Sequence, residues 1–150
     1  MLADKLNWAV FGGVAAAIHN RSFYRIFDDI DIIIENDKNK IINLLSDYEV
    51  CFKRRTRRER GYLTIDKVKI ELLFLTDEKE LDLADGKFKF HNIERIKFND
   101  LEIPVIDLQS LHCAKMRHKK SLEKESERYK KKLENCNKDI QIIEDLLNKI

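Results

Sequence analysis

The chain has 150 residues, of which 43% are hydrophobic and 37% are charged, and its formal net charge is +2. This length and hydrophobic content suffice for one sizeable core, so we expect a single domain with an appendage. The near balance of charge predicts no general affinity for polyanions, and no apolar run approaches the ~18 residues of a membrane span. No basic and apolar leader precedes Trp8, so we expect a soluble, cytoplasmic protein with no membrane partner.

The cysteine pattern excludes two further classes. Cys51, Cys113 and Cys136 are odd in number, widely spaced and without a C-x-x-C pair. Such spacing argues against a disulfide framework and against structural zinc. We therefore expect three reduced thiols.

The first quarter of the chain is its most informative stretch. A short apolar run, Trp8–Phe11, predicts the first strand and stops at the pair Gly12-Gly13. The small residues of 14–19 then predict a closely packed helix. Because glycines lack a Cβ, backbone N–H groups and the start of that helix can approach an anion, which makes the pair a candidate phosphate site.

The second apolar run, 29–35, carries two carboxylates on one face. Isoleucines alternate with Asp29 and Asp31, and this period of two predicts a strand. Both acids then project from the same face, about 7 Å apart along the backbone, whereas Asp28 points to the other face and is not counted as a ligand. Two such carboxylates repel one another unless a cation lies between them. Mg²⁺ prefers oxygen ligands and usually shares its shell with substrate phosphates, so we expect a Mg²⁺ site here.

The order and spacing of Gly12-Gly13, Arg25 and Asp29-Ile30-Asp31 resemble the signature of the DNA polymerase beta superfamily of nucleotidyltransferases. Among its members, the small lincosamide and aminoglycoside nucleotidyltransferases are the most similar. The resemblance implies an α+β fold, a mixed β-sheet flanked by helices with a C-terminal helical tail. It also implies that Asp29 and Asp31 hold the catalytic metal and that Gly12, Gly13 and Arg25 contact the nucleotide phosphates.

The next segments predict a helix and a basic strand. Asn36 or Asp37 can cap the helix. Its apolar stripe consists of Ile41, Ile42, Leu44 and Leu45. A strand over 48–58 follows, and the run 53–60 contains six Lys or Arg residues. This run could grip a triphosphate or a polynucleotide, or be a solvated edge strand; the lack of interleaved aromatic residues argues against nucleic acid.

A hairpin is predicted over 61–74, with its turn at Asp66-Lys67. In its second arm alternate residues are apolar, and Glu71 lies on the opposite face. A buried, unpaired carboxylate is costly, so Glu71 should have a partner or a metal. The family resemblance assigns Glu71 as the third carboxylate, either a metal ligand or the general base toward the acceptor hydroxyl. Asp66 competes for this role, but its turn composition favours Glu71.

The rest of the chain predicts a surface excursion over 76–92, a hairpin over 94–105, and a helical tail that Asp107 caps and that breaks near 135–137. Residues 138–140 also resemble an element near the end of these transferases. An apolar stripe at 3/4 spacing runs along the tail, formed by Leu133, Cys136, Ile140, Ile143, Leu147 and Ile150. It can seal against the core or a second subunit, and we expect a homodimer.

These patterns divide the chain into a catalytic core, 1–106, and a C-terminal helical region, 107–150. The predicted function is Mg²⁺-dependent transfer of a nucleoside monophosphate, AMP from ATP, to a hydroxyl of a small molecule or protein. ATP or another nucleoside triphosphate is the expected partner. Two alternatives remain open: a nucleotidyltransferase-fold antitoxin and a non-catalytic protein or RNA interaction module.

Overall fold

The computed structural model describes residues 6–55, 58–125 and 127–150. Within them the chain is a mixed α+β protein, as the sequence predicts. In chain order the elements are β1 (Trp8–Phe11), α1 (Gly12–Asn20), β2 (Asp29–Ile34), α2 (Lys38–Leu44), β3 (Cys51–Arg55), β4 (Arg58–Ile65), β5 (Val68–Phe74), β6 (Leu81–Leu83), β7 (Gly86–Phe88), β8 (Ile93–Phe98), β9 (Leu101–Ile106), α3 (Leu108–Glu123) and α4 (Lys130–Leu147). None of these helices is long and apolar enough to cross a membrane.

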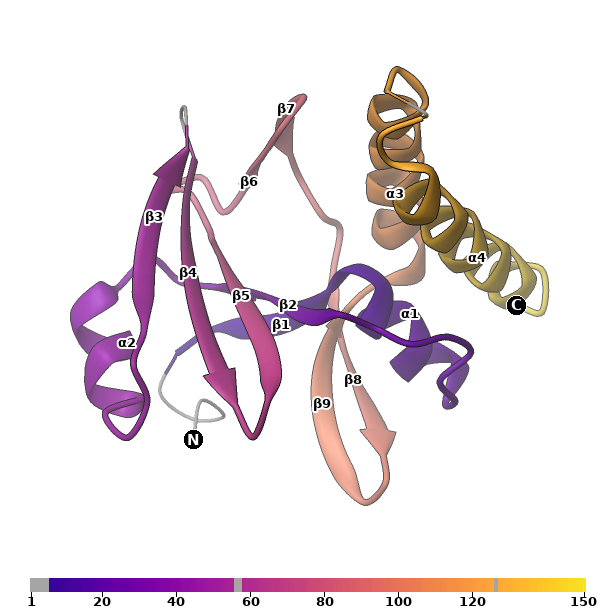
Figure 1. Ribbon diagram of the computed structural model, residues 1–150. Coiled ribbons are helices and arrows are strands. Elements are labelled where there is room, and N and C mark those ends of the chain that lie inside the picture. Colours follow the sequence, from indigo (N-terminus) through magenta and orange to yellow (C-terminus); the bar gives the residue numbers. More distant parts are fainter. Residues whose placement is uncertain (1–5, 56–57, 126) are drawn as a thin grey trace.

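The main sheet joins segments that are distant in sequence (Figure 1). Its strand order is β3-β4-β5-β2-β1-β9-β8, and β6 and β7 form a separate ribbon. β1 pairs antiparallel with β2 and parallel with β9, and β2 pairs parallel with β5. Strands β2 and β1 thus lie at the centre of the sheet, between the β4–β5 hairpin and the β8–β9 hairpin.

The two faces of the sheet have different covers. On one face, Ile41 of α2 and Leu45, which directly follows this helix, pack with Leu72. Ile33 and Leu73 pack on the other face, in the core that also contains buried residues of α1, α3 and α4. In Figure 1, α2 lies beside β3, whereas α3 and α4 lie on the opposite side of the picture. Because side chains alternate along a strand, Asp29, Asp31 and Glu71 share the face of Ile33 and Leu73.

Local sequence signals place the turns and caps as expected. The two hairpins turn at Asp66-Lys67 and Asn99-Asp100, and all four residues have positive φ, as tight two-residue hairpins require. The carboxylate of Asp37 accepts a hydrogen bond from the backbone N–H of Lys40 at 3.1 Å and caps α2. That of Asp107 accepts one from the N–H of Ser110 at 3.1 Å and caps α3. These short-range interactions depend on neighbouring residues only.

Several local predictions are wrong. Ile42 is 48% exposed, so it does not belong to the buried stripe of α2, in which Ile41 and Leu45 are buried and Leu44 is partly buried. The segment 76–92 is not merely a surface excursion, because β6 and β7 pair and bury Leu81 and Phe88 in the core. The break in the tail lies between α3 and α4, whereas 135–137 is inside α4. The basic strand is also shorter than expected, and residues 56–57 of its basic run lie outside the described residues.

The apolar stripe of the tail packs against its own chain. Cys136 and Ile140 contact Leu122 of α3, and Ile143 joins the main core. The last stripe residue, Ile150, is 94% exposed. Since the stripe that motivated the homodimer is mostly covered within one chain, the homodimer stays a prediction without that support.

Candidate metal and nucleotide site

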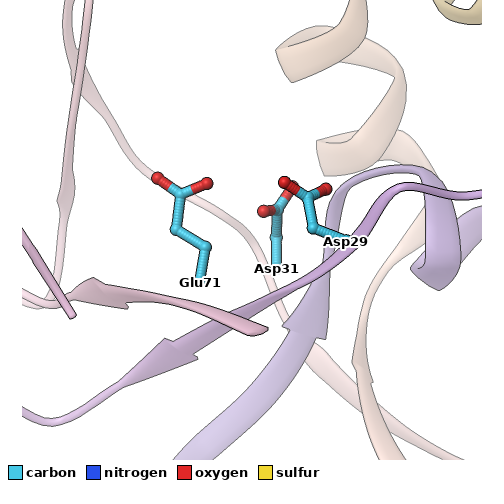
Figure 2. Close-up of side chains that lie close together, drawn as sticks. All are labelled: Asp29, Asp31 and Glu71. Carbon is cyan, nitrogen blue, oxygen red and sulfur yellow. The ribbon is translucent and has the colours of Figure 1, made fainter. Parts of the chain in front are cut away.

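Three carboxylates converge where β2 and β5 run side by side. Asp29 and Asp31 come from β2, and the parallel register places Asp31 directly opposite Glu71 of β5. One ligand oxygen of each residue lies within 4.8 Å of the other two. Figure 2 shows the three side chains rising from the strands toward a common space. The structure therefore brings together all three acids that the sequence singled out, while Asp66 lies in the turn between β4 and β5.

The cluster holds an excess of negative charge. Burial, followed by repulsion from Asp29 and Glu71, raises the pKa of Asp31 to about 8, and Lys115 only partly offsets this. A divalent cation would relieve the repulsion, and three carboxylate oxygens are the donors that Mg²⁺ and other hard cations prefer. The donor set thus fits a metal ion.

Strand β4 orients Glu71. Tyr62 is its cross-strand neighbour, and the Tyr62 hydroxyl donates a hydrogen bond to Glu71 Oε1 at 3.4 Å. Arg60, two residues earlier on the same face, places its Nε 3.7 Å from the same oxygen. Arg60 is buried and also donates from Nη2 to the carbonyl of Asp82 at 2.7 Å. Glu71 therefore has partners besides a metal, as expected for an acid in an apolar strand.

The glycine pair has a steric reason at each position. Gly12 adopts φ +68°, and a Cβ there would lie 2.5 Å from Asp31 Oδ2. Only glycine lets the start of α1 approach the carboxylate cluster this closely. At Gly13 a Cβ would lie 2.5 Å from Arg25 Nη2 and 2.9 Å from Asp139 Oδ2. The pair consequently sits between the metal-binding candidates and a buried ion pair.

Arg25 is held by a buried carboxylate outside the cluster. Its Nε and Nη2 donate to Asp139 at 2.9 Å each, and its guanidinium lies 4.0 Å from the centre of the Phe27 ring. Tyr24 donates to the same carboxylate at 2.6 Å, and Lys115 Nζ lies 2.8 Å from it. The guanidinium of Arg25 therefore has a structural role as the partner of Asp139. Contact between Arg25 and the nucleotide stays a prediction.

The sequence motifs did not predict a role for Asp139. This residue was noted only as part of a segment, 138–140, that resembles an element of the transferases. Burial favours its neutral form, but the hydrogen bond from Arg25 and the charge of Lys115 outweigh burial and hold the pKa of Asp139 below its ordinary value. A signal was present, because Asp139 lies three residues after Cys136 and four before Ile143, on the buried side of α4. An acid on such a face needs a cation partner.

A cavity of about 600 Å³ opens beside the cluster, a size typical of small-molecule sites. Asp31, Glu71 and Gly12 line it on the sheet, and residues of the β6–β7 ribbon, α3 and α4 form its other walls. Its lining carries the cations Arg58, Arg60, Lys115, Arg117 and Lys132, together with the carboxylates Asp85 and Glu125 outside the cluster. The carboxylate cluster therefore faces cations that can contact an anionic ligand.

Comparison with known proteins identifies the fold. No protein-family profile and no curated protein sequence matches the chain. Among solved structures, a candidate nucleotidyltransferase from Thermotoga maritima is similar with a TM-score of 0.62 and 22% identity, over 85% of this chain and 83% of that one. The lincosamide antibiotic adenylyltransferase LnuA, lincomycin-bound, is similar with a TM-score of 0.52 and 21% identity, over 71% and 73% of the two chains.

A third structure, ANT(2")-Ia in complex with adenylyl-2"-tobramycin, has a TM-score of 0.55 and 10% identity, over 96% of this chain and 88% of that one. These likenesses show the fold: the chain has the nucleotidyltransferase fold. The fold that the sequence motifs predict is thereby confirmed.

Proposed function

We propose that this chain is an enzyme that transfers a nucleoside monophosphate, AMP from ATP, to a hydroxyl group in a Mg²⁺-dependent reaction. The observation that carries the proposal is the set of three carboxylate oxygens within 4.8 Å of one another. They lie at a cavity that is large enough for a small ligand and whose lining includes Arg58, Arg60 and Lys115. The nucleotidyltransferase fold supports the same reaction class.

The carboxylates have defined tasks in such a reaction. Asp29 and Asp31 would hold the metal, because they share one face of β2 and lie beside Glu71. Bound Mg²⁺ supplies neutralisation of the phosphate charge and activation of the attacking hydroxyl. Glu71 would either complete the metal shell or accept the proton of the acceptor hydroxyl. Both tasks need the position beside Asp31 that the strand register provides.

The start of α1 would bind the triphosphate. The N-terminus of a helix carries unpaired N–H groups and partial positive charge, which favour phosphate oxygens. Gly12 brings this end close to Asp31. Lys115, which lines the same cavity and pairs with Asp139, would add a cation near the reacting phosphate.

Calorimetric titration tests this function. Wild-type protein is titrated with a non-hydrolysable ATP analogue, with and without Mg²⁺, beside an Asp29→Asn/Asp31→Asn variant. We expect metal-dependent binding that the double variant loses by about tenfold or more, since it removes two charged ligands. Asp28→Asn is the matched control, because Asp28 is adjacent and exposed but outside the cluster, and should bind as wild type does.

Turnover is then followed as pyrophosphate release from labelled ATP with candidate hydroxyl acceptors. Metal-dependent nucleotide binding that survives unchanged in the double variant would refute the assigned site. A wild-type protein that binds no nucleotide even with Mg²⁺ would refute the enzymatic function and leave an interaction module with this fold.

A further inference from the structure

The strand order indicates which end of the cavity would hold the triphosphate and which end would hold the acceptor. In-line nucleotidyl transfer requires the attacking oxygen to approach from the side opposite the departing pyrophosphate. The proposed phosphate site at Gly12 lies on the β1 side of Asp31. On the other side of β2 come β5, with Glu71, and then β4. The acceptor therefore approaches past Glu71, from the β4 side of the cavity.

The β4 side presents two arginines. Arg58 and Arg60 are two residues apart on one strand, so their side chains share a face, and both line the cavity. Arg60 already forms an ion pair with Glu71 and donates a hydrogen bond to a backbone carbonyl. Arg58 has no ion-pair or hydrogen-bond partner for its side chain within the described parts of the chain. Its half-buried guanidinium is therefore available to a ligand.

The other charges nearby do not cancel Arg58. Asp85, on the β6–β7 ribbon, accepts hydrogen bonds from Arg117 Nε and Nη2 at 2.8 and 2.6 Å and is thereby neutralised. Glu125 also lines the cavity, but it lies at the exposed turn after α3, where water screens its charge. Burial, and after it the charge of Arg58, lowers the pKa of Arg60. Because Arg58 lines this wall without a carboxylate partner among the described residues, its charge favours an anionic ligand and disfavours a cationic one.

We propose that the acceptor is a small hydroxyl compound that carries a phosphate or carboxylate group, and that Arg58 binds this group. The inference rests on the proposed nucleotidyl transfer. A planar guanidinium suits both anions because it can form two parallel hydrogen bonds with either. An aminoglycoside such as tobramycin carries several ammonium groups, which Arg58 would repel.

The transfer itself needs no further reactant. The acceptor oxygen bonds to the α-phosphorus, and the bond from that phosphorus to the pyrophosphate oxygen breaks. The hydroxyl proton passes to a carboxylate of the cluster, and pyrophosphate leaves with the bonding electron pair. Arg58 positions the acceptor by its anionic group and does not touch the reacting atoms.

The test uses the full chain loaded with Mg²⁺ and the non-hydrolysable ATP analogue, so that the triphosphate site is already filled. Calorimetry then measures binding of inorganic phosphate, glycerol 3-phosphate, glycerate, glycerol and tobramycin. We expect saturable binding of the anions and none of glycerol or tobramycin. Comparing glycerol 3-phosphate with glycerate shows which anion the site prefers.

Arg58→Gln should weaken binding of the preferred anion by about tenfold or more, the loss of a charged hydrogen-bond pair, with unchanged affinity for the ATP analogue. Arg54→Gln is the matched control, because Arg54 is an exposed arginine of β3 outside the cavity lining, and should bind as wild type does. Both variants are checked for a wild-type unfolding transition.

Each other outcome overturns the inference. If the loaded wild type binds no anion, or binds glycerol or tobramycin as tightly, the acceptor end does not select negative charge. If Arg58→Gln weakens the ATP analogue instead, Arg58 belongs to the triphosphate site. If the wild type does not bind the ATP analogue at all, that titration refutes the proposed function itself. The acceptor proposal, which rests on that function, is then refuted as well.

Discussion

The carboxyl of Asp31 binds a proton far more tightly in the folded chain than in water, because burial and two neighbouring acids disfavour its charge. Its pKa rises from an ordinary 3.8 to about 8, although Lys115 lowers it in part. Between these two values the folded chain keeps a proton that the unfolded chain has released. The free energy of unfolding therefore falls as pH rises through this window and levels off above about 8.

This linkage predicts a pH dependence that one substitution removes. Without metal, we expect the Tm of the wild type to fall from about pH 5 to about pH 8, and that of Asp31→Asn to fall less, since Asn has no proton to lose. Because a metal competes with the proton, Mg²⁺ should raise the wild-type Tm more at the alkaline end. Thermal melts with and without EDTA measure both effects. Parallel profiles for the two proteins would contradict the raised pKa.

At the scale of elements, a single buried carboxylate fastens α4 to the rest of the molecule. Asp139 is fully buried, and it binds Arg25 from the segment after α1 and Lys115 from α3. Those two cations are mostly buried as well. Removing one member of such a group leaves uncompensated charge in a poorly solvated place, which is costly.

Asp139→Asn should therefore lower the free energy of unfolding by about 3 to 5 kcal/mol, measured by urea denaturation near neutral pH. The pKa of Asp139 is depressed, so this increment is present above its ordinary value and is lost as pH falls through the lower folded value. Asp145→Asn, at an exposed position of the same helix, should change stability by less than about 0.5 kcal/mol. Equal effects of the two variants would show that the buried group contributes nothing.

At the scale of the whole molecule, the C-terminal helices complete the core of the sheet. Leu111 and Ile143 are fully buried in the same cluster as Ala15 and Ala16 of α1. Removing α3 and α4 would expose this face, and each fully buried large side chain lost costs about 2 to 5 kcal/mol in comparable cases. The division at residue 106 thus separates two parts of one core.

A chain shortened to residues 1–106 should therefore show no cooperative unfolding transition, whereas the full chain should unfold in one step. Circular dichroism during thermal and urea denaturation measures this. A shortened chain with a cooperative transition of its own would show that the catalytic core folds independently of the helical region.

Sequence reasoning found the parts of the site that depend on alternation and on short turns. Asp29 and Asp31 follow from the period of two, and the cap at Asp107 and the turn at Asp66-Lys67 follow from adjacent residues. The assignment of Glu71 needed the family resemblance as well. Its place beside Asp31 depends on the pairing of two strands about 40 residues apart in the sequence. Neighbouring residues do not indicate which distant strands will pair.

Local patterns were enough to predict how residue types alternate and where strands can turn, since these depend on interactions within a few residues. The pairing of Arg25 with Asp139, 114 residues away, and the covering of the tail stripe by its own chain depend instead on how the chain folds. The fold also places Arg58 at a cavity wall rather than on a solvated edge. Such partners are chosen by burial and charge, because a buried ion must be compensated by whichever residue the folded chain brings near.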